Sequence, residues 1–145
     1  MVAKGFHQTP GLNFSETFNL VVKPSTVKVV LFVAITRNWD VRQIDINNAF
    51  LNGKLEENIF MPQPEGFVDP TQLHAVCKLH RSLYGLRQAP RGWYDRLKQT
   101  LLAWGFRPLT MDSSLFLLHS SSGVIWLMVY VDDILLTGNN NSLLQ

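Results

Sequence analysis

Cysteine is almost absent from this chain. Cys77 is the single cysteine among 145 residues, which excludes a disulfide framework and a cysteine-based zinc site. We therefore expect a reducing compartment. The four histidines are equally uninformative, because His7, His74, His80 and His119 are scattered without the short spacing of metal ligands.

Long apolar runs are also missing. No uncharged stretch reaches the roughly 18 to 20 residues that span a bilayer, and the longest candidate, residues 124–131, is followed directly by two aspartates. The start of the chain, residues 2–7, lacks the apolar core of a signal peptide. We expect an intracellular chain that is not secreted and has no membrane partner.

Charge is sparse and unevenly placed. Charged residues make up 17% of the chain and hydrophobic residues 46%, with a net charge of +2; these are globular values for one domain or a piece of a larger one. Basic residues crowd residues 81–98, whereas acidic residues gather at Asp45, Glu56, Glu57, Asp132 and Asp133. A solvated face is the common explanation of such a basic cluster.

The hydrophobic pattern predicts alternating helices and strands. We expect irregular structure over residues 1–24, and a helix over residues 27–36 that is capped by Ser25 or Thr26, with a strand as the alternative. Further expected elements are a strand over 39–46, a short helix over 47–55, a loop over 62–74, a strand over 75–79 and a hairpin of residues 114–119 and 124–131. This order predicts an α+β fold in which helices cover one face of an antiparallel sheet.

A second helix is predicted over residues 91–104. Pro90 suits its first turn and Gly105 its end. The spacing places Trp93, Leu97, Leu101 and Trp104 on one face. We expect Trp93, Tyr94 and Trp104 to be core residues of the helix rather than platforms for base stacking.

Two adjacent carboxylates interrupt the apolar run of residues 125–136. Asp132 and Asp133 follow a stretch that reads as a buried strand or hairpin. Burying ionised carboxylates without a partner is costly, and neighbouring ones repel each other. Divalent metal ions are a usual partner for clustered carboxylate oxygens, and a solvated hairpin turn is an equal alternative.

A third carboxylate lies in another expected strand. Asp45 stands between Ile44 and Ile46, and alternation along a strand turns it away from both. The same alternation places Tyr130 with Asp132, unless the turn breaks the pleat. Asp45 and Asp132 are therefore expected to meet on one face of the sheet, from neighbouring strands.

Five ordered blocks carry a resemblance to a known family. They are QIDINNAFLNG (43–53), MPQPEGF (61–67), SLYGLRQAPRGWY (82–94), DSSLF (112–116) and YVDDI (130–134). In this order and spacing, the chain resembles the reverse transcriptase of copia-type LTR retrotransposons over essentially its whole length. A lone YVDD would be weak evidence, but five ordered blocks are specific.

The resemblance implies a partial right-hand polymerase fold with a palm-like antiparallel sheet. Residues 1–145 form a single partial reverse-transcriptase domain, in which 1–24 are a remnant of the fingers and 25–145 are mostly palm. By the same resemblance, we expect the thumb and RNase H regions to be absent from this chain. We therefore expect the isolated chain to have weak or no polymerase activity. The alternative is a non-catalytic, nucleic-acid-binding transposon remnant.

The resemblance also implies the chemistry. Asp45, Asp132 and Asp133 bind two Mg²⁺ ions, with Mn²⁺ as a substitute, for nucleotidyl transfer to a primer 3′-hydroxyl by an RNA-directed DNA polymerase. The partners are an RNA or DNA template with its primer, deoxynucleoside triphosphates and the rest of a polyprotein. The implied location is cytoplasmic, in a virus-like particle, or nuclear.

Further residues are assigned to substrate binding by the same resemblance. Phe50 occupies the position of a steric gate that excludes a ribose 2′-hydroxyl, whereas an ordinary core aromatic is the alternative. Gln88 lines the incoming nucleotide, and a turn residue before a helix is its alternative. The resemblance adds Ile46 and Tyr130 to the substrate site. Arg87 and Arg91 flank Gln88 and contact nucleic-acid phosphates, solvated arginines being the common alternative.

Overall fold

The computed structural model describes residues 3, 8 and 22–144. Most of the expected fingers remnant, residues 1–24, thus lies outside the described residues. The helices and strands are α1 (Pro24–Thr36), β1 (Val41–Asp45), the 3₁₀ helix η2 (Ala49–Asn52), β2 (Lys54–Pro62), β3 (Val76–Arg81), α2 (Ala89–Ala103), β4 (Arg107–Leu109), β5 (Asp112–Ser120), β6 (Gly123–Tyr130), β7 (Asp133–Gly138) and the 3₁₀ helix η3 (Asn141–Leu143).

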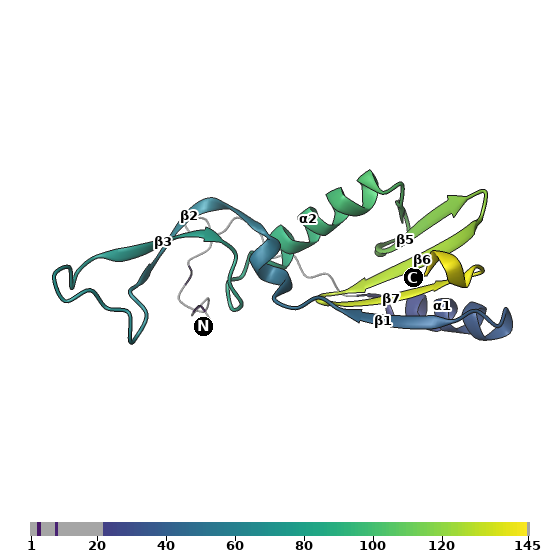
Figure 1. Ribbon diagram of the computed structural model, residues 1–145, viewed down its shortest axis with the longest axis horizontal. Coiled ribbons are helices and arrows are strands. Elements are labelled where there is room, and N and C mark those ends of the chain that lie inside the picture. Colours follow the sequence, from purple (N-terminus) through teal and green to yellow (C-terminus); the bar gives the residue numbers. More distant parts are fainter. Residues whose placement is uncertain (1–2, 4–7, 9–21, 145) are drawn as a thin grey trace.

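Two antiparallel sheets organise these elements. The larger sheet has the strand order β1-β7-β6-β5-β4, and β2 pairs with β3 in a separate ribbon. Figure 1 shows the ribbon extending away from the larger sheet, whose β6–β7 turn lies at the end nearest the ribbon. The expected α+β class with an antiparallel sheet is confirmed.

The two helices pack on opposite faces of the larger sheet. Alternation along β6 directs Leu127 and Val129 toward the core formed with α2. Met128, which lies between them, packs instead with Val30 of α1 and Leu115 of β5. Our expectation that the helices cover one face was therefore wrong. Apolar side chains of β5 and β6 point to both faces of the sheet, so each face must be buried by a helix packed against it.

The start of α1 differs from the expected cap. The helix begins at Pro24, and Lys23 occupies the cap position without a capping hydrogen bond from its side chain. Instead, Asp112 at the start of β5 accepts hydrogen bonds through Oδ2 from the Lys23 N–H and from the Thr26 hydroxyl. A carboxylate near a helix N-terminus is favourable, so a residue remote in sequence replaces the expected Ser25 or Thr26 cap.

Helix α2 follows the prediction except at its end. It contains Pro90 in its first turn, and Gly105 just beyond it has φ +91°. Trp93, Leu97 and Leu101 are buried, whereas Trp104 is 68% exposed. The expectation of a core role for Trp104 was wrong, because this residue follows the last helical residue and leaves the buried stripe.

The other expected elements form with shorter or shifted bounds. The short helix is reduced to η2, and β2 begins two residues after it. The loop between β2 and β3 spans residues 63–75, close to the expected 62–74. Strands β2, β4 and β7 were not among the expected elements. Strand β4 is only three residues long, and Pro108 interrupts its strand pattern. Among the described helices, none is long and apolar enough to cross a membrane.

Candidate functional site

A tight hairpin turn positions the acidic pair. Tyr130 at the end of β6 pairs with Asp133 at the start of β7, so Val131 and Asp132 form a two-residue turn. Cross-strand partners share a face, and Tyr130 therefore lies on the same face as Asp133. The turn breaks the pleat, and the expected grouping of Tyr130 with Asp132 does not occur.

The register of β1 with β7 places Asp45 directly opposite Asp133. Such partners have Cβ atoms about 4.5–5.5 Å apart, and like charges in this relation are destabilising. The Gln43 side chain donates a hydrogen bond from Nε2 to Asp133 Oδ1 at 2.8 Å, which offsets part of that repulsion. The cross-strand partner of Asp45 is thus Asp133 rather than the expected Asp132.

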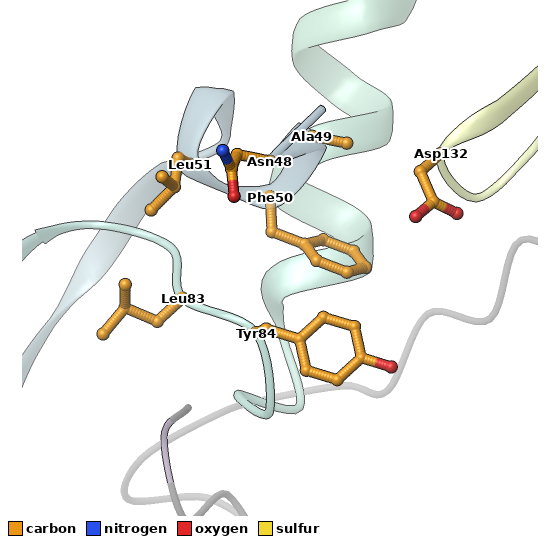
Figure 2. A pocket seen from close by; sticks show the side chains of 7 residues that line it. All are labelled: Asn48, Ala49, Phe50, Leu51, Leu83, Tyr84 and Asp132. Atoms are coloured by element: carbon orange, nitrogen blue, oxygen red, sulfur yellow. The ribbon is translucent and has the colours of Figure 1, made fainter. Parts of the chain in front are cut away.

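Asp132 lies in a different environment. It is half-buried and lines a pocket of about 350 Å³ together with Leu83, Tyr84 and residues 48–51. Figure 2 shows the rings of Phe50 and Tyr84 side by side, both extending toward the Asp132 side of the pocket. Asp132, from the β6–β7 turn, and Phe50, from η2, therefore meet across one cavity.

Phe50 is positioned by the chain reversal between β1 and η2. Asn48 precedes η2 with φ +55°, a left-handed conformation that Asn tolerates better than most residues. The half-buried ring of Phe50 packs against the α2 core and lies 5.4 Å, between ring centroids, from Tyr84. Phe50 thus touches the core and also lines the pocket, and its role as a steric gate stays a prediction.

Tyr84 was missed by the sequence analysis. It is 64% exposed, although its ring packs against Phe50. An aromatic residue directly before Gly85, which has φ +97°, was an available signal for an exposed aromatic at a tight turn. The pattern alone did not say which pocket that turn faces.

Gln88 is buried at the start of α2. Its Oε1 accepts a hydrogen bond from Gln8 Nε2 at 2.9 Å, and Gln8 Oε1 in turn accepts from the Arg87 backbone N–H at 2.9 Å. Gln88 is not among the residues that line the pocket with Asp132. Its assignment to the incoming nucleotide stays a prediction.

The other predicted site residues lie around this end of the sheet or at the start of α2. Ile46 packs against the α2 core, and its N–H donates to the Asp132 carbonyl oxygen at 2.9 Å. Tyr130 is exposed. Arg87 and Arg91 are exposed, and Arg91 Nε lies 3.9 Å from Asp95 Oδ2, one helical turn onward. An exposed pair of this kind contributes little to stability.

The carboxylates fit a metal ion only in part. Within the part of the chain that the structure describes, no three His, Cys, Asp or Glu side chains form a metal-binding group. Carboxylate oxygens are nevertheless the ligands that Mg²⁺ prefers, and this ion is usually bound by one or two carboxylates together with substrate phosphates. Asp45, Asp132 and Asp133 therefore suit a site that substrate completes, not a closed protein cage.

A fourth carboxylate, Asp112, is structural. Its Oδ1 accepts hydrogen bonds from the Ser114 N–H at 3.0 Å and the Ser114 hydroxyl at 2.6 Å, and Oδ2 binds the start of α1. Burial raises the pKa of Asp112, but the hydrogen bonds from Ser114, Thr26 and Lys23 outweigh burial and hold the pKa below its ordinary value. The charged form thus joins β5 to α1.

Comparison with known proteins gives consistent matches. The model of the family described as "Reverse transcriptase (RNA-dependent DNA polymerase)" matches residues 1–145. The chain is 49% identical over 145 residues to the retrovirus-related Pol polyprotein from transposon RE1 of Arabidopsis thaliana, which covers 100% of this chain and 10% of the relative. It is 40% identical over 145 residues to the retrovirus-related Pol polyprotein from transposon TNT 1-94 of Nicotiana tabacum. This match covers 99% of the chain and 11% of the relative.

A more distant relative extends the comparison beyond plants. The Transposon Ty1-BL Gag-Pol polyprotein of Saccharomyces cerevisiae is 27% identical over 142 residues, which cover 96% of this chain and 8% of the relative. The chain thus spans about a tenth of the length of the curated relatives it matches. No solved structure gives a significant match.

Proposed function

The chain belongs to the reverse transcriptase (RNA-dependent DNA polymerase) family, and from this premise we propose that it carries an RNA-directed DNA polymerase centre. The reaction adds a deoxynucleotide to a primer 3′-hydroxyl opposite an RNA or DNA template. One observation supports this most: Asp132 and Phe50, from distant segments, line the same pocket. The pair Asp45 and Asp133 lies beside the turn that carries Asp132.

The three carboxylates are the proposed ligands of two Mg²⁺ ions, with Mn²⁺ as a substitute. When bound, such ions activate the attacking hydroxyl and stabilise the leaving oxygen of an in-line displacement. Asp45 and Asp133 are like charges on directly opposite residues, which is unfavourable without a cation. Asp132 contributes a carboxylate on the pocket side of the same turn.

Phe50 is the proposed selector of the sugar. Its ring lines the pocket opposite Asp132 and is backed by the α2 core, so it cannot easily move away from a bound nucleotide. A rigid ring beside the sugar rejects a 2′-hydroxyl by steric clash rather than by attraction. The proposed substrate is therefore a deoxynucleoside triphosphate.

Other residues have proposed roles in binding substrate and nucleic acid. Gln88, Ile46 and Tyr130 are proposed to contact the nucleotide or primer. Arg87 and Arg91 are exposed on the first turn of α2 and just before it, where they can meet template–primer phosphates by charge. Since the relatives are about ten times longer than the matched segment, other regions of a Pol polyprotein are proposed partners.

Primer extension tests this function. The chain is incubated with a primed RNA template, deoxynucleotides and Mg²⁺, and Asp132→Asn is compared with Asp69→Asn, which alters an exposed loop carboxylate. We expect weak extension by the unmodified chain, extension at least about 100-fold lower with Asp132→Asn, and extension within twofold of the unmodified chain with Asp69→Asn. Equal extension by Asp132→Asn and the unmodified chain would contradict the proposal.

Nucleic-acid binding is measured in parallel. Salt-dependent binding of the primed template that survives the double change Asp45→Ala and Asp132→Ala would favour the non-catalytic alternative. Extension that requires Asp132 would exclude that alternative.

A further inference from the structure

The turn that carries Asp132 has an unusual backbone conformation. Val131 has φ +56°, in the left-handed region that β-branched residues rarely adopt because Cβ crowds the backbone. This residue is the first of the two turn residues, where a hairpin with positive φ usually has glycine or asparagine. Such a conformation persists only where surrounding contacts determine it.

Two hydrogen bonds from separate elements hold this turn. The Trp93 indole in α2 donates from Nε1 to the Val131 carbonyl oxygen at 2.6 Å. The N–H of Ile46, the residue after β1, donates to the Asp132 carbonyl oxygen at 2.9 Å. The two accepting carbonyl groups belong to the peptide units on either side of the Asp132 α-carbon. Both bonds therefore fix the direction in which the Asp132 side chain leaves the backbone.

Trp93 is itself held by close backbone packing. Its side chain is 5% exposed. A Cβ on Gly53 would lie 2.7 Å from the Trp93 backbone nitrogen, and a Cβ on Gly92 would lie 2.8 Å from the Lys54 carbonyl oxygen. The start of α2 thus rests directly on the backbone that follows η2. Since η2 carries Phe50, the Trp93 indole is fixed relative to the wall of the pocket.

We propose that Trp93 is a positioning residue, whose indole N–H holds the Val131–Asp132 turn so that the Asp132 carboxylate faces Phe50 across the pocket. This inference rests on the proposed function of Asp132. It assigns to Trp93 a polar role in addition to its packing in the α2 core. A residue with only a packing role would lose nothing specific when the N–H is removed and the ring is kept.

The test first removes the indole N–H of Trp93 and then relieves the backbone strain at Val131. Trp93→Phe keeps an aromatic ring in the core but cannot donate, and hydrogen exchange of the Ile46 amide reports on the turn, because this amide binds the Asp132 carbonyl. We expect exchange at Ile46 to rise about tenfold relative to amides in the centre of β5 and β6. In a Val131→Gly background the rise should fall below about threefold, because glycine adopts positive φ without strain.

A matched control separates the turn from general stability. Leu101→Val shortens a buried side chain on the same helix, far from the hydrogen bond to Val131. It should raise exchange at Ile46 and in β5 and β6 to the same extent. If Trp93→Phe behaves in the same way as Leu101→Val, the inference is overturned.

A second measurement needs no substitution at Trp93. Indole N–H exchange is compared in the unmodified chain between Trp93 and the exposed Trp104. We expect at least about 100-fold slower exchange for Trp93, because its N–H is buried and bonded. Equal rates at the two indoles would overturn the inference even if Trp93→Phe does not fold.

The outcomes distinguish this inference from the proposed function. If nucleotide incorporation requires Asp132, we expect Trp93→Phe to lower kcat about tenfold with KM for the nucleotide within twofold. Incorporation that requires Asp132, with Ile46 exchange and kcat unchanged in Trp93→Phe, would overturn the inference alone. The predicted exchange pattern, together with incorporation that Asp132→Asn leaves unchanged, would support the role of the Trp93 hydrogen bond at the turn and contradict the polymerase proposal.

Discussion

Asp45 in β1 lies directly opposite Asp133 in β7, and the Gln43 side chain donates to one oxygen of Asp133 at 2.8 Å. Two like charges in this relation repel each other, which is unfavourable at this edge of the sheet. A divalent cation would relieve it. This relationship gives the proposed metal site a physical signature that can be measured without substrate.

Removing one of these charges should affect stability in opposite ways with and without metal. We expect Asp45→Asn to leave the free energy of unfolding unchanged or raise it by up to about 1 kcal/mol without metal. Mn²⁺ at 100 times its Kd should stabilise the unmodified chain by about 2.7 kcal/mol, and Asp45→Asn should lose most of this gain. Thermal melts with and without Mn²⁺ test both, with Asp40→Asn as the control. If Mn²⁺ stabilises Asp45→Asn as much as the unmodified chain, the proposed metal site at Asp45 and Asp133 is contradicted.

Asp112 should give stability that depends on acid pH. Its pKa is held below the ordinary 3.8 in the folded chain, so the unfolded chain binds more protons and stability falls as the pH drops below about 3.8 through the folded pKa. We expect Asp112→Asn to lower the free energy of unfolding at pH 7 by about 1–3 kcal/mol and to flatten the acid slope. Urea titrations at pH 7 and pH 3 measure this, and an unchanged slope would refute the role of the charge.

The close approach of α2 to the segment after η2 should not tolerate a side chain. A Cβ on Gly53 or Gly92 meets backbone atoms at 2.7–2.8 Å, which cannot be relieved by a side-chain rotation. We expect Gly53→Ala or Gly92→Ala to destabilise the fold by about 1–3 kcal/mol. Gly66→Asn is the control, because a Cβ there meets nothing within 4 Å and Asn tolerates its positive φ. Denaturant melts measure the free energy of unfolding of each variant. Equal values for Gly53→Ala, Gly92→Ala and Gly66→Asn would contradict this close packing.

Tyr84 should support the pocket through its ring and not its hydroxyl. The ring lies 5.4 Å from that of Phe50, and aromatic pairs of this kind contribute about 0.5–1.5 kcal/mol. We expect Tyr84→Ala to raise KM for the deoxynucleotide about three- to tenfold, whereas Tyr84→Phe stays within twofold. Steady-state incorporation kinetics distinguish the two, and a loss of activity in Tyr84→Phe would instead indicate a role for the hydroxyl.

Local sequence patterns predicted most elements of the fold. The two helices, the hairpin of β5 and β6 and the loop before β3 follow from periodicity and turn residues, which act over a few positions. The cap of α1 could not be predicted in this way, because it comes from Asp112, which binds Thr26 from 86 residues further along the chain. The coverage of both sheet faces was also missed, since it depends on which apolar residues of β5 and β6 meet each helix.

The candidate site was predictable in its residues and not in its geometry. The acidic pair and Asp45 stand out as charges among apolar residues. Their arrangement depends on the register of β1 with β7 and on the two-residue turn at Val131, which no local pattern determines. The contact of Phe50 with Tyr84 is likewise a product of two distant turns, so Tyr84 was overlooked.

Single-nucleotide incorporation with a deoxynucleotide and the matching ribonucleotide tests the central claim most directly. We predict that the unmodified chain strongly prefers the deoxynucleotide, that Asp132→Asn loses incorporation of both by at least about 100-fold, and that Phe50→Ala incorporates the ribonucleotide much more readily relative to the deoxynucleotide. Incorporation that is unchanged by Asp132→Asn, together with unchanged sugar preference in Phe50→Ala, would contradict a polymerase centre in this pocket.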